Sequence, residues 1–406
     1  MRLCALLKLF CINAKKWNIN PKRLNNKHNK ENSVGHYPSS VTNKQLFFLL
    51  FLALTTYTTI DLPKIMAQSA GRISWLPIIL ASIVFAIVAF MICKLNAMNE
   101  GKVLFDYGKD IVGKYFNYAI CVFYIIYFTI IAVYLKTKLV GLLSANFLPL
   151  TPPYALLIVG IALFGYIAYK GVTNVARMTE IIGVAFILVT TVLCGIMIFE
   201  GMHYNVLPLL NPLEVKNIVP AMKDTITGFG GIEILFIIPF TALNKKAPRQ
   251  TFRTLIIIGL FYALIVESTI MILGINNTAM FNDSFIEAIK IVEVPIIERT
   301  DIFYLTFGLT SLFAGLFIVN VAILELACKI FAKAKRSVLT IIMSIILFIL
   351  AMIATNITNI QEIAKQSFPI IIAIASLAIP VVLFTIAIIK KQATKRRKRE
   401  MKDHEF

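Results

Sequence analysis

Three glycines and a glutamate inside a hydrophobic segment are the residues of this sequence best suited to binding. The stretch Thr227–Glu233 reads T-G-F-G-G-I-E. Gly228, Gly230 and Gly231 weaken a helix, and backbone groups freed from a helix inside a bilayer need protein or water around them. A carboxylate beside them is costly without such surroundings. The pattern predicts an unwound segment where Glu233 contacts a ligand amine or a proton. The alternatives are helix packing for the glycines and a helix-dipole interaction for Glu233.

A second polar interruption lies in the first long apolar segment. The stretch Thr55–Pro63 reads T-T-Y-T-T-I-D-L-P. Pro63 lacks a backbone donor and disfavours helical angles at the residue before it, so we expect a break with Asp61 as the N-cap of a half-helix over about 62–70. A carboxylate at that positive helix end favours an amine-bearing ligand or a proton. The candidate ligand-binding residues in this stretch are Thr56, Thr58, Thr59 and Asp61.

The composition defines the class of protein that positions these residues. Of 406 residues, 58% are hydrophobic and 15% are charged. The apolar runs are continuous rather than alternating, which favours membrane-spanning helices over a β-barrel. We therefore predict an all-α polytopic membrane protein with ten transmembrane helices. The predicted spans are about 45–70, 75–95, 116–135, 154–170, 180–199, 216–243, 252–274, 302–328, 337–355 and 368–389.

The lysines and arginines predict the orientation. With the N-terminus inside, 31 of the 40 basic residues fall in cytoplasmic segments, which favours cytoplasmic positions for both termini. The formal net charge of +19 follows largely from this bias and from a basic tail, 392–406, that we expect to meet anionic lipid rather than nucleic acid. Residues 41–391 form the predicted ten-helix domain. Residues 1–40 are a basic extension that we expect to be disordered, or to lie upstream of the true start codon.

Spans one and six hold corresponding positions in two five-helix halves. Both are overlong and both are interrupted. Matching interruptions of this kind point to a transporter-type site at the interface of an inverted repeat. The two halves share no visible sequence identity, so the repeat is inferred from the breaks.

The chain resembles the spore germination permeases, which are the B subunits of nutrient germinant receptors within the amino acid–polyamine–organocation transporters. The resemblance extends from about Val41 to Lys391. It rests on the order and spacing of several short stretches. These are Thr42–Phe47, Asp61–Lys64, Leu148–Pro152, Tyr169–Gly171 with Arg177, Glu180 and Ile181, Leu207–Leu210, Gly230–Gly231 with Glu233, Pro239–Phe240, and Glu298–Arg299.

The resemblance implies a small nutrient ligand, an amino acid above all, and two partners: a membrane A subunit and a lipoprotein C subunit. It also implies that spans three and eight flank the broken pair. The candidate residues there are Tyr127, Ile131, Thr310 and Ala314. One departure is that Thr56 and Thr58 stand where the family usually has glycines. We therefore expect span one to be less unwound, with a narrower and more polar pocket.

Other charged residues in or near the spans have structural interpretations. Glu267 is expected to be paired structurally, and Glu325 is expected to pair with Lys329 one helical turn later. Arg177 and Glu180 are expected to form a salt bridge or to serve as helix-end charges.

Two further features are expected at membrane interfaces. Lys136 and Lys138 end span three and are expected to extend to the interface as anchors. The stretch 285–292 shows helical spacing and predicts an interfacial helix, with a structured loop as the equal alternative.

The sequence argues against enzymatic chemistry. All four histidines lie outside the predicted spans, and the six cysteines show no metal-binding spacing. We therefore expect no catalytic residue, no metal and no cofactor. The first functional hypothesis is a ligand-binding germinant-receptor subunit that shifts conformation, and the second is a secondary amino acid transporter coupled to protons or cations.

Overall fold

The structure, a computed structural model, is built from helices. It describes residues 41–99, 102–208, 215–238, 246–292, 300–357 and 360–403, and these contain no strand. Its α-helices are α3 (Asn43–Ser69), α4 (Trp75–Met98), α5 (Leu104–Val112), α6 (Lys114–Asn146), α7 (Pro153–Lys170), α8 (Val172–Glu200), α9 (Ile218–Thr225), α10 (Ala247–Met280), α11 (Ser284–Ile291), α12 (Thr300–Ile330), α13 (Arg336–Thr355), α14 (Ile360–Ile372) and α15 (Ile379–Asp403). The 3-10 helices are η3 (Gly71–Ile73), η4 (His203–Asn205), η5 (Val215–Asn217), η6 (Ile226–Phe229) and η7 (Ile232–Phe236), and η8 (Ala373–Ala378) is a π-helix.

The predicted membrane spans correspond to long apolar helices. In the described ranges, eight helices are long and apolar enough to cross a membrane, and the bent helix α3 raises the number to nine. The predicted span 216–243 corresponds to α9, η6 and η7 and continues into residues 239–245, which lie outside the described ranges. The all-α polytopic class is confirmed, and the count of ten spans stays a prediction.

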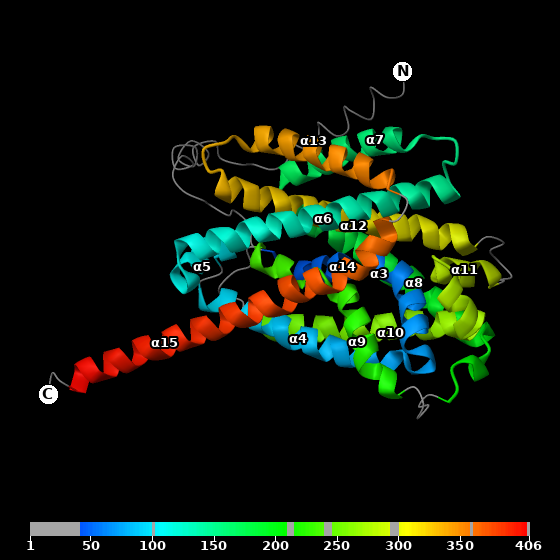
Figure 1. Ribbon diagram of the computed structural model, residues 1–406, viewed down its shortest axis with the longest axis horizontal. Helices are drawn as coiled ribbons and strands as arrows, with labels where there is room; N and C mark the ends of the chain where they lie inside the picture. Colours follow the sequence, from blue (N-terminus) through cyan, green and yellow to red (C-terminus); the bar gives the residue numbers. More distant parts are fainter. Residues whose placement is uncertain are drawn as a thin grey trace, which may run out of the picture. The chain divides into compact units, whose positions relative to one another are not determined.

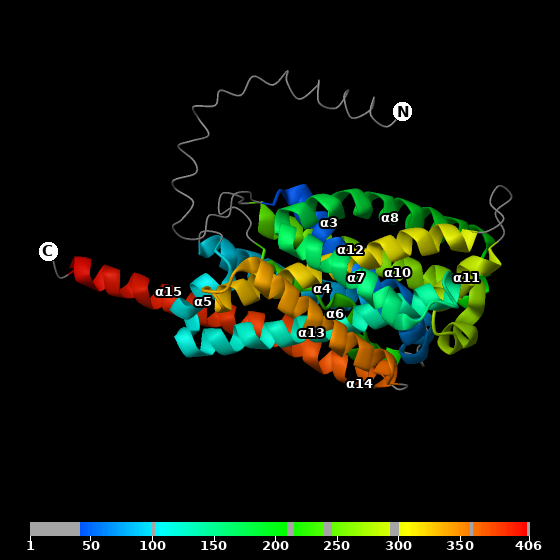
Figure 2. The same cartoon turned by 90° about the horizontal axis from the view of Figure 1, so that it is seen from above.

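The helices pack in two groups around α3. Helix α10 packs along α3 and α4, whereas α12 packs along α6 and α8, and α13 along α6 and α7. Figure 1 shows α7 and α13 at one edge of the bundle and α4 and α10 at the other. Helix α15 continues past the neighbouring helices in both views (Figures 1 and 2).

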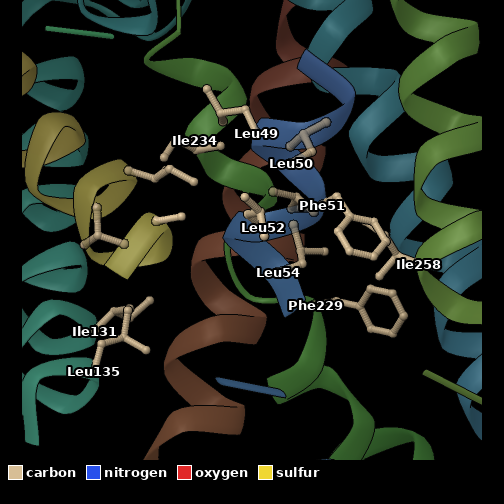
Figure 3. Packing of buried hydrophobic residues seen from close by; sticks show 14 of the residues in the cluster. Leu49, Leu50, Phe51, Leu52, Leu54, Ile131, Leu135, Phe229, Ile234 and Ile258 are labelled. Atoms are coloured by element: carbon tan, nitrogen blue, oxygen red, sulfur yellow. The ribbon is translucent and has the colours of Figure 1, made fainter. Parts of the chain in front are cut away.

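Helix α3 is enclosed on every side in its middle part, around residues 48–56. Near-consecutive residues of a helix point in different directions, and here each is at most 1% exposed: Leu50, Phe51, Leu52 and Leu54. Figure 3 shows these side chains close to Ile258 of α10 and to Phe229 and Ile234 of the η6–η7 segment. A helix that is apolar all round is a central helix, so α3 is placed to contact every other element of the site.

The stretch 285–292 is helical, as predicted, and forms α11. Its apolar residues Phe285, Ile286, Ala288 and Ile289 are at most 2% exposed, because α11 packs on α10, α3 and α12. Protein therefore covers the apolar face that was expected to meet lipid, and the position of α11 at the membrane interface stays a prediction. The predicted extension 1–40 lies outside the described residues.

Candidate functional site

The first interruption is a bend in α3 rather than an unwound gap. The helix turns by 52° between Thr56 and Thr58. The hydroxyls of Thr55, Thr56 and Thr58 each donate a hydrogen bond to the carbonyl four residues earlier. Such back-bonding bends helices without breaking them. The expectation that threonines keep span one from unwinding is confirmed.

Asp61 does not cap a half-helix. It lies inside α3, which remains helical through Pro63, so the predicted capping role is wrong. The bend is made earlier by the threonine hydroxyls, and loss of the single Pro63 donor is tolerated there. The Asp61 carboxylate instead accepts hydrogen bonds from Tyr134 Oη and Lys138 Nζ of α6, both at 2.8 Å.

The second interruption is a true change of backbone conformation at the predicted glycines. Gly230 is extended, with φ −63° and ψ 129°, and Gly231 has φ 125°, a value that L-residues rarely adopt. A Cβ added at Gly231 would lie 3.2 Å from the carbonyl oxygen of Ala53 in α3. Glycine is therefore required at position 231 for two reasons: it adopts a positive φ, and it lets the backbone approach α3 closely.

The carbonyl of Gly228 links three elements. It accepts a hydrogen bond from Tyr262 Oη of α10 at 2.8 Å and from Thr58 Oγ1 of α3 at 3.5 Å. A backbone group released from the regular helix is therefore satisfied by side chains of its neighbours, as it must be away from water. The two predicted breaks lie side by side.

Glu233 is the most deeply buried carboxyl of the site, with 0% exposure. Its Oε2 accepts hydrogen bonds from the Gly231 N–H and from Ser376 Oγ, both at 3.0 Å. Tyr127 also interacts with the carboxyl, although Oε1 makes no hydrogen bond of ordinary geometry. No ion pair to Glu233 occurs in the described part of the chain. A buried carboxyl of this kind needs a proton or a cation to neutralise it.

The last span supplies a residue that the sequence reasoning missed. Ser376 lies in the π-helix η8, and the carbonyl of the preceding Ala375 accepts a hydrogen bond from Tyr124 Oη of α6 at 2.9 Å. Interruptions of this type occur frequently at functional sites. The available signal was a serine between Pro369 and Pro380 in an otherwise apolar segment.

The predicted contact between spans one and eight is present, but through different residues of α12. Thr56 Oγ1 lies 3.4 Å from the Ser311 carbonyl oxygen, and Tyr304 Oη donates to Thr59 Oγ1 at 3.4 Å. The predicted residues Thr310 and Ala314 do not take part in these two contacts. Thr310 donates to the Thr306 carbonyl of its own helix, and the side chain of Ala314 is fully buried.

Span three connects the parts of the site along one helical face. Tyr127 lies at Glu233, Ile131 follows four residues later, and Tyr134 lies at Asp61. Ile131 is 7% exposed and points into the apolar interior (Figure 3). The predicted residues therefore form neighbouring clusters along α6 rather than one open pocket.

A narrow recess lies beside this region, and none of the predicted site residues lines it. Its nine lining residues are all apolar and come from α3, α8, α12 and the stretch that begins at η7; they include Leu49, Val172, Ile234 and Ile318. Such a wall offers no hydrogen bond to a polar ligand, so we assign the candidate site to the clusters around Glu233.

Two charged groups inside the helices have structural partners. Glu267 accepts a hydrogen bond from the Trp75 N–H at 3.1 Å, at the start of α4, as expected of a structural carboxyl. Lys136 is 2% exposed, donates to Asn320 Oδ1 at 3.4 Å and lies over the Phe164 ring. The expectation that it extends to the interface is wrong, because Asn320 of α12 and Phe164 of α7 enclose its ammonium group inside the bundle.

Lys138 is likewise no interfacial anchor. Its side chain is 14% exposed and is committed to Asp61. Sequence position at the end of a predicted span suggested the anchor role, but α6 continues for two more turns to Asn146. The lysine therefore faces the bundle and not the headgroups.

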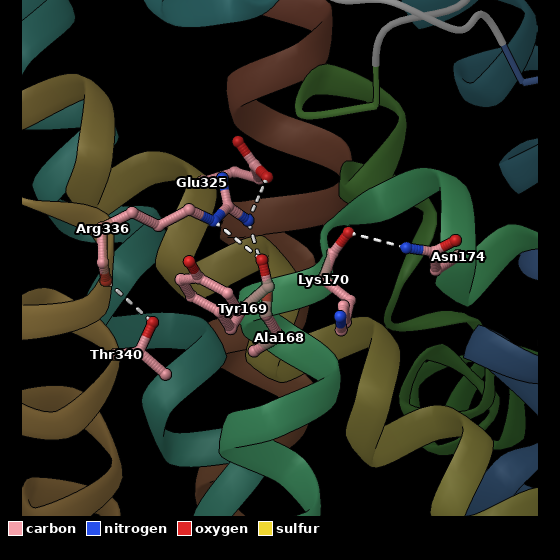
Figure 4. Close-up of polar contacts among 7 residues, drawn as sticks. All are labelled: Ala168, Tyr169, Lys170, Asn174, Glu325, Arg336 and Thr340. Atoms are coloured by element: carbon pink, nitrogen blue, oxygen red, sulfur yellow. Dashed lines mark hydrogen bonds and ion pairs between the residues drawn. The ribbon is translucent and has the colours of Figure 1, made fainter.

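At the other end of the bundle, Arg336 of α13 ties three helices together. It donates to Glu325 Oε1 at 2.8 Å and to the carbonyls of Ala168 and Tyr169 at the end of α7, as Figure 4 shows. The predicted Glu325–Lys329 pair is therefore wrong, because a competing arginine lies closer in space.

The remaining ion pairs at this end also join different helices. Lys329 pairs with Asp106 of α5 at 2.9 Å. Glu180 forms a salt bridge, one of its two expected roles, with Lys44 of α3 at 2.9 Å. Tertiary neighbours rather than sequence neighbours decide these pairs.

The chain is similar to a known protein family and to several of its curated members. A profile of the family described as "Spore germination protein" matches residues 40–360. Three curated relatives are from Bacillus subtilis (strain 168). Spore germination protein YndE is 23% identical over 366 residues, 88% of this chain and 99% of the relative. Spore germination protein KB is 23% identical over 89% of this chain and 98% of the relative, and spore germination protein B2 is 22% identical over 65% and 72%.

Solved structures share the fold. A substrate-bound, outward-open Na⁺-coupled sialic acid symporter aligns with a TM-score of 0.61 and 13% identity, over 85% of this chain and 78% of the symporter. MhsT in complex with L-phenylalanine aligns with the same TM-score and identity, over 87% and 89%. At this identity the likeness concerns the fold alone. It confirms the predicted class of transporter-like helical membrane proteins built on a five-helix inverted repeat.

Proposed function

The chain belongs to the spore germination protein family, and from this premise we propose that it is the membrane subunit of a germinant receptor. In this proposal it binds a small nutrient, an amino acid, between the bend of α3 and the η6–η7 segment. Binding shifts the arrangement of the helices and signals germination. No chemical step is involved.

The observation that carries the proposal is the Glu233 carboxyl. It is fully buried beside two non-helical glycines, and no cation of the described chain neutralises it. The ammonium group of an amino acid supplies the missing charge and can bind to a carboxyl already held in place by Gly231 and Ser376. Interrupted helices that present backbone groups near the bilayer midplane are a common basis of such sites.

The partners and location that we propose are supported by the membership of the family. We propose that the signal passes to a membrane A subunit and a lipoprotein C subunit, in the inner membrane of the cell or spore. Both termini are placed in the cytoplasm, because 31 of 40 basic residues then lie on that side.

Direct binding tests the proposal. The full chain, purified with its co-purifying subunits, is titrated with a panel of labelled amino acids. Glu233→Gln keeps the size of the side chain but removes its charge, and a charged hydrogen bond is worth about 1.5–3 kcal/mol, so we expect Kd to rise roughly 10- to 100-fold. Glu267→Gln is the matched control and should leave Kd within about threefold.

Two results would contradict the proposal: no amino acid binds, or Glu233→Gln binds as tightly as the native chain. The second candidate function is a proton- or cation-coupled amino acid transporter, which the fold of the Na⁺-coupled symporter supports. Accumulation of the bound amino acid in vesicles under a proton or sodium gradient favours the transporter. A germination defect in spores carrying Glu233→Gln, with no uptake by the native chain, favours the receptor.

A further inference from the structure

We propose that Asp61, Tyr134 and Lys138 form a latch between α3 and α6 that controls access to the region around Glu233. This inference rests on the proposed function, because it presumes that a ligand must reach that region. It assigns a role to three side chains that the ligand-binding proposal does not use.

The latch is built from direct polar contacts. One oxygen of Asp61 accepts from Lys138 Nζ and the other from Tyr134 Oη, each at 2.8 Å. The two charged side chains are 19% and 14% exposed. The Tyr134 ring packs edge-on against Phe368 of α14, with 4.8 Å between ring centroids, and Lys138 Nζ lies 5.8 Å from the Tyr134 ring centroid. Both carboxylate oxygens are thus occupied, and an aromatic pair fixes the tyrosine.

The burial of this pair distinguishes it from a second ion pair of α3. Lys44 and Glu180, at the far end of the helix, are 70% and 28% exposed. Exposed pairs are screened by water and contribute little, whereas a partly buried pair with an additional hydrogen bond, here from Tyr134, holds its geometry more strongly. The two ends of α3 are therefore held unequally, and the Asp61 end is the tighter one.

The latch joins the two groups of helices. Helix α3 packs with α10, which also packs with α4, and α6 packs with α12 and α13. A rotation of one group against the other, as in transporters of this architecture, must separate Asp61 from Tyr134 and Lys138. Tyr127 and Ile131 lie on the same face of α6, about two turns and one turn before Tyr134, so the latch stands between them and the α11 end of the bundle.

The loop before α11 adds a second carboxyl group, that of Asp283. Asp283 lies close enough to interact with both Lys138 and Asp61, and burial raises its pKa above the ordinary value for aspartate. Lys64 of α3 donates to Asn282 Oδ1 of the same loop at 2.6 Å. The loop thus contacts α3 through Asn282 and lies beside both charged groups of the latch through Asp283.

Chemical accessibility tests the latch without a ligand. The six native cysteines are replaced by alanine, and Ile131→Cys serves as the reporter in the full chain, held in lipid nanodiscs so that both faces meet the reagent. Labelling rates are measured with a cationic and an anionic methanethiosulfonate reagent. We expect Asp61→Asn and Lys138→Met each to raise both rates at least tenfold, and the exchange Asp61→Lys with Lys138→Asp to restore them to within threefold.

The two reagents separate access from local charge, because a mere change of field raises one rate and lowers the other. Glu287→Gln, which breaks the exposed Glu287–Lys290 pair on α11, is the control and should change neither rate. Rates within twofold of native in Asp61→Asn would overturn the proposal, as would a change with one reagent only. If the charge variants do not yield folded protein, Tyr134→Phe decides, with an expected threefold rise. Failure of amino acid binding would leave these rates unaffected, so the two proposals fail separately.

Discussion

Replacing Gly231 by alanine tests how the glycine segment is held against α3. Gly231 has φ 125°, and an added Cβ would lie 3.2 Å from the Ala53 carbonyl oxygen. That oxygen belongs to a helix backbone and cannot rotate away as a flexible side chain would. The substitution therefore combines an unfavourable dihedral angle with a contact that only a shift of one whole segment relieves.

We expect this change to lower the free energy of unfolding by about 1–3 kcal/mol, the usual cost of holding a non-glycine residue in such a conformation. The shift also moves the Gly231 N–H away from Glu233 Oε2, which now lies 3.0 Å from it. Amino acid binding should therefore weaken together with stability.

Thermal unfolding of the purified chain, followed by size-exclusion chromatography with fluorescence detection, measures the effect as a fall of a few degrees in the midpoint. Gly141→Ala is the matched control, because Gly141 lies inside α6 with nothing within 4 Å of its added Cβ. A helical Gly→Ala change of this kind stabilises by roughly 0.5–1 kcal/mol. The reasoning is refuted if Gly231→Ala melts at or above the native midpoint, or if Gly141→Ala falls equally.

Two further predictions concern charges outside the site. Arg336→Lys should lower the free energy of unfolding by about 1–3 kcal/mol, because one ammonium group cannot reach Glu325 and the carbonyls of Ala168 and Tyr169 together. The measurement is the thermal unfolding midpoint, and a midpoint equal to the native one would contradict this prediction. Burial raises the pKa of Asp283, so its contribution to stability is present below the ordinary aspartate pKa of about 4 and is lost as pH rises through the higher folded value. Asp283→Asn should therefore gain stability relative to the native chain as pH rises above about 4, and parallel pH profiles of the two midpoints would count against it.

Much of the candidate site could be predicted because its signals are local. Glycine alone tolerates the angles at Gly231, and a carboxylate beside such a segment is costly in an apolar span, so Gly230, Gly231 and Glu233 stand out in the sequence. The threonines of α3 also act locally, each through a bond to the carbonyl one turn earlier. Ser376 was missed because its role depends on a contact across 143 residues of sequence.

The charged residues show the opposite case. Asp61 resembles a helix cap when only Pro63 is considered, and Glu325 resembles half of a one-turn ion pair. Both instead have partners on other helices, Lys138 and Arg336. Side-chain charges select the nearest opposite charge in space, and sequence spacing carries that information only within a single helix.

The class of fold, the two interruptions and the family could be predicted from the sequence, because hydrophobic length, glycine conformation and short motifs are properties of contiguous residues. Three features emerged only from the packed helices: span one bends instead of unwinding at Asp61, α11 is buried, and Tyr127 and Ser376 meet Glu233. These outcomes depend on the rotation and crossing of the helices. Packing of entire helix faces sets that rotation, and no single segment of the sequence encodes it.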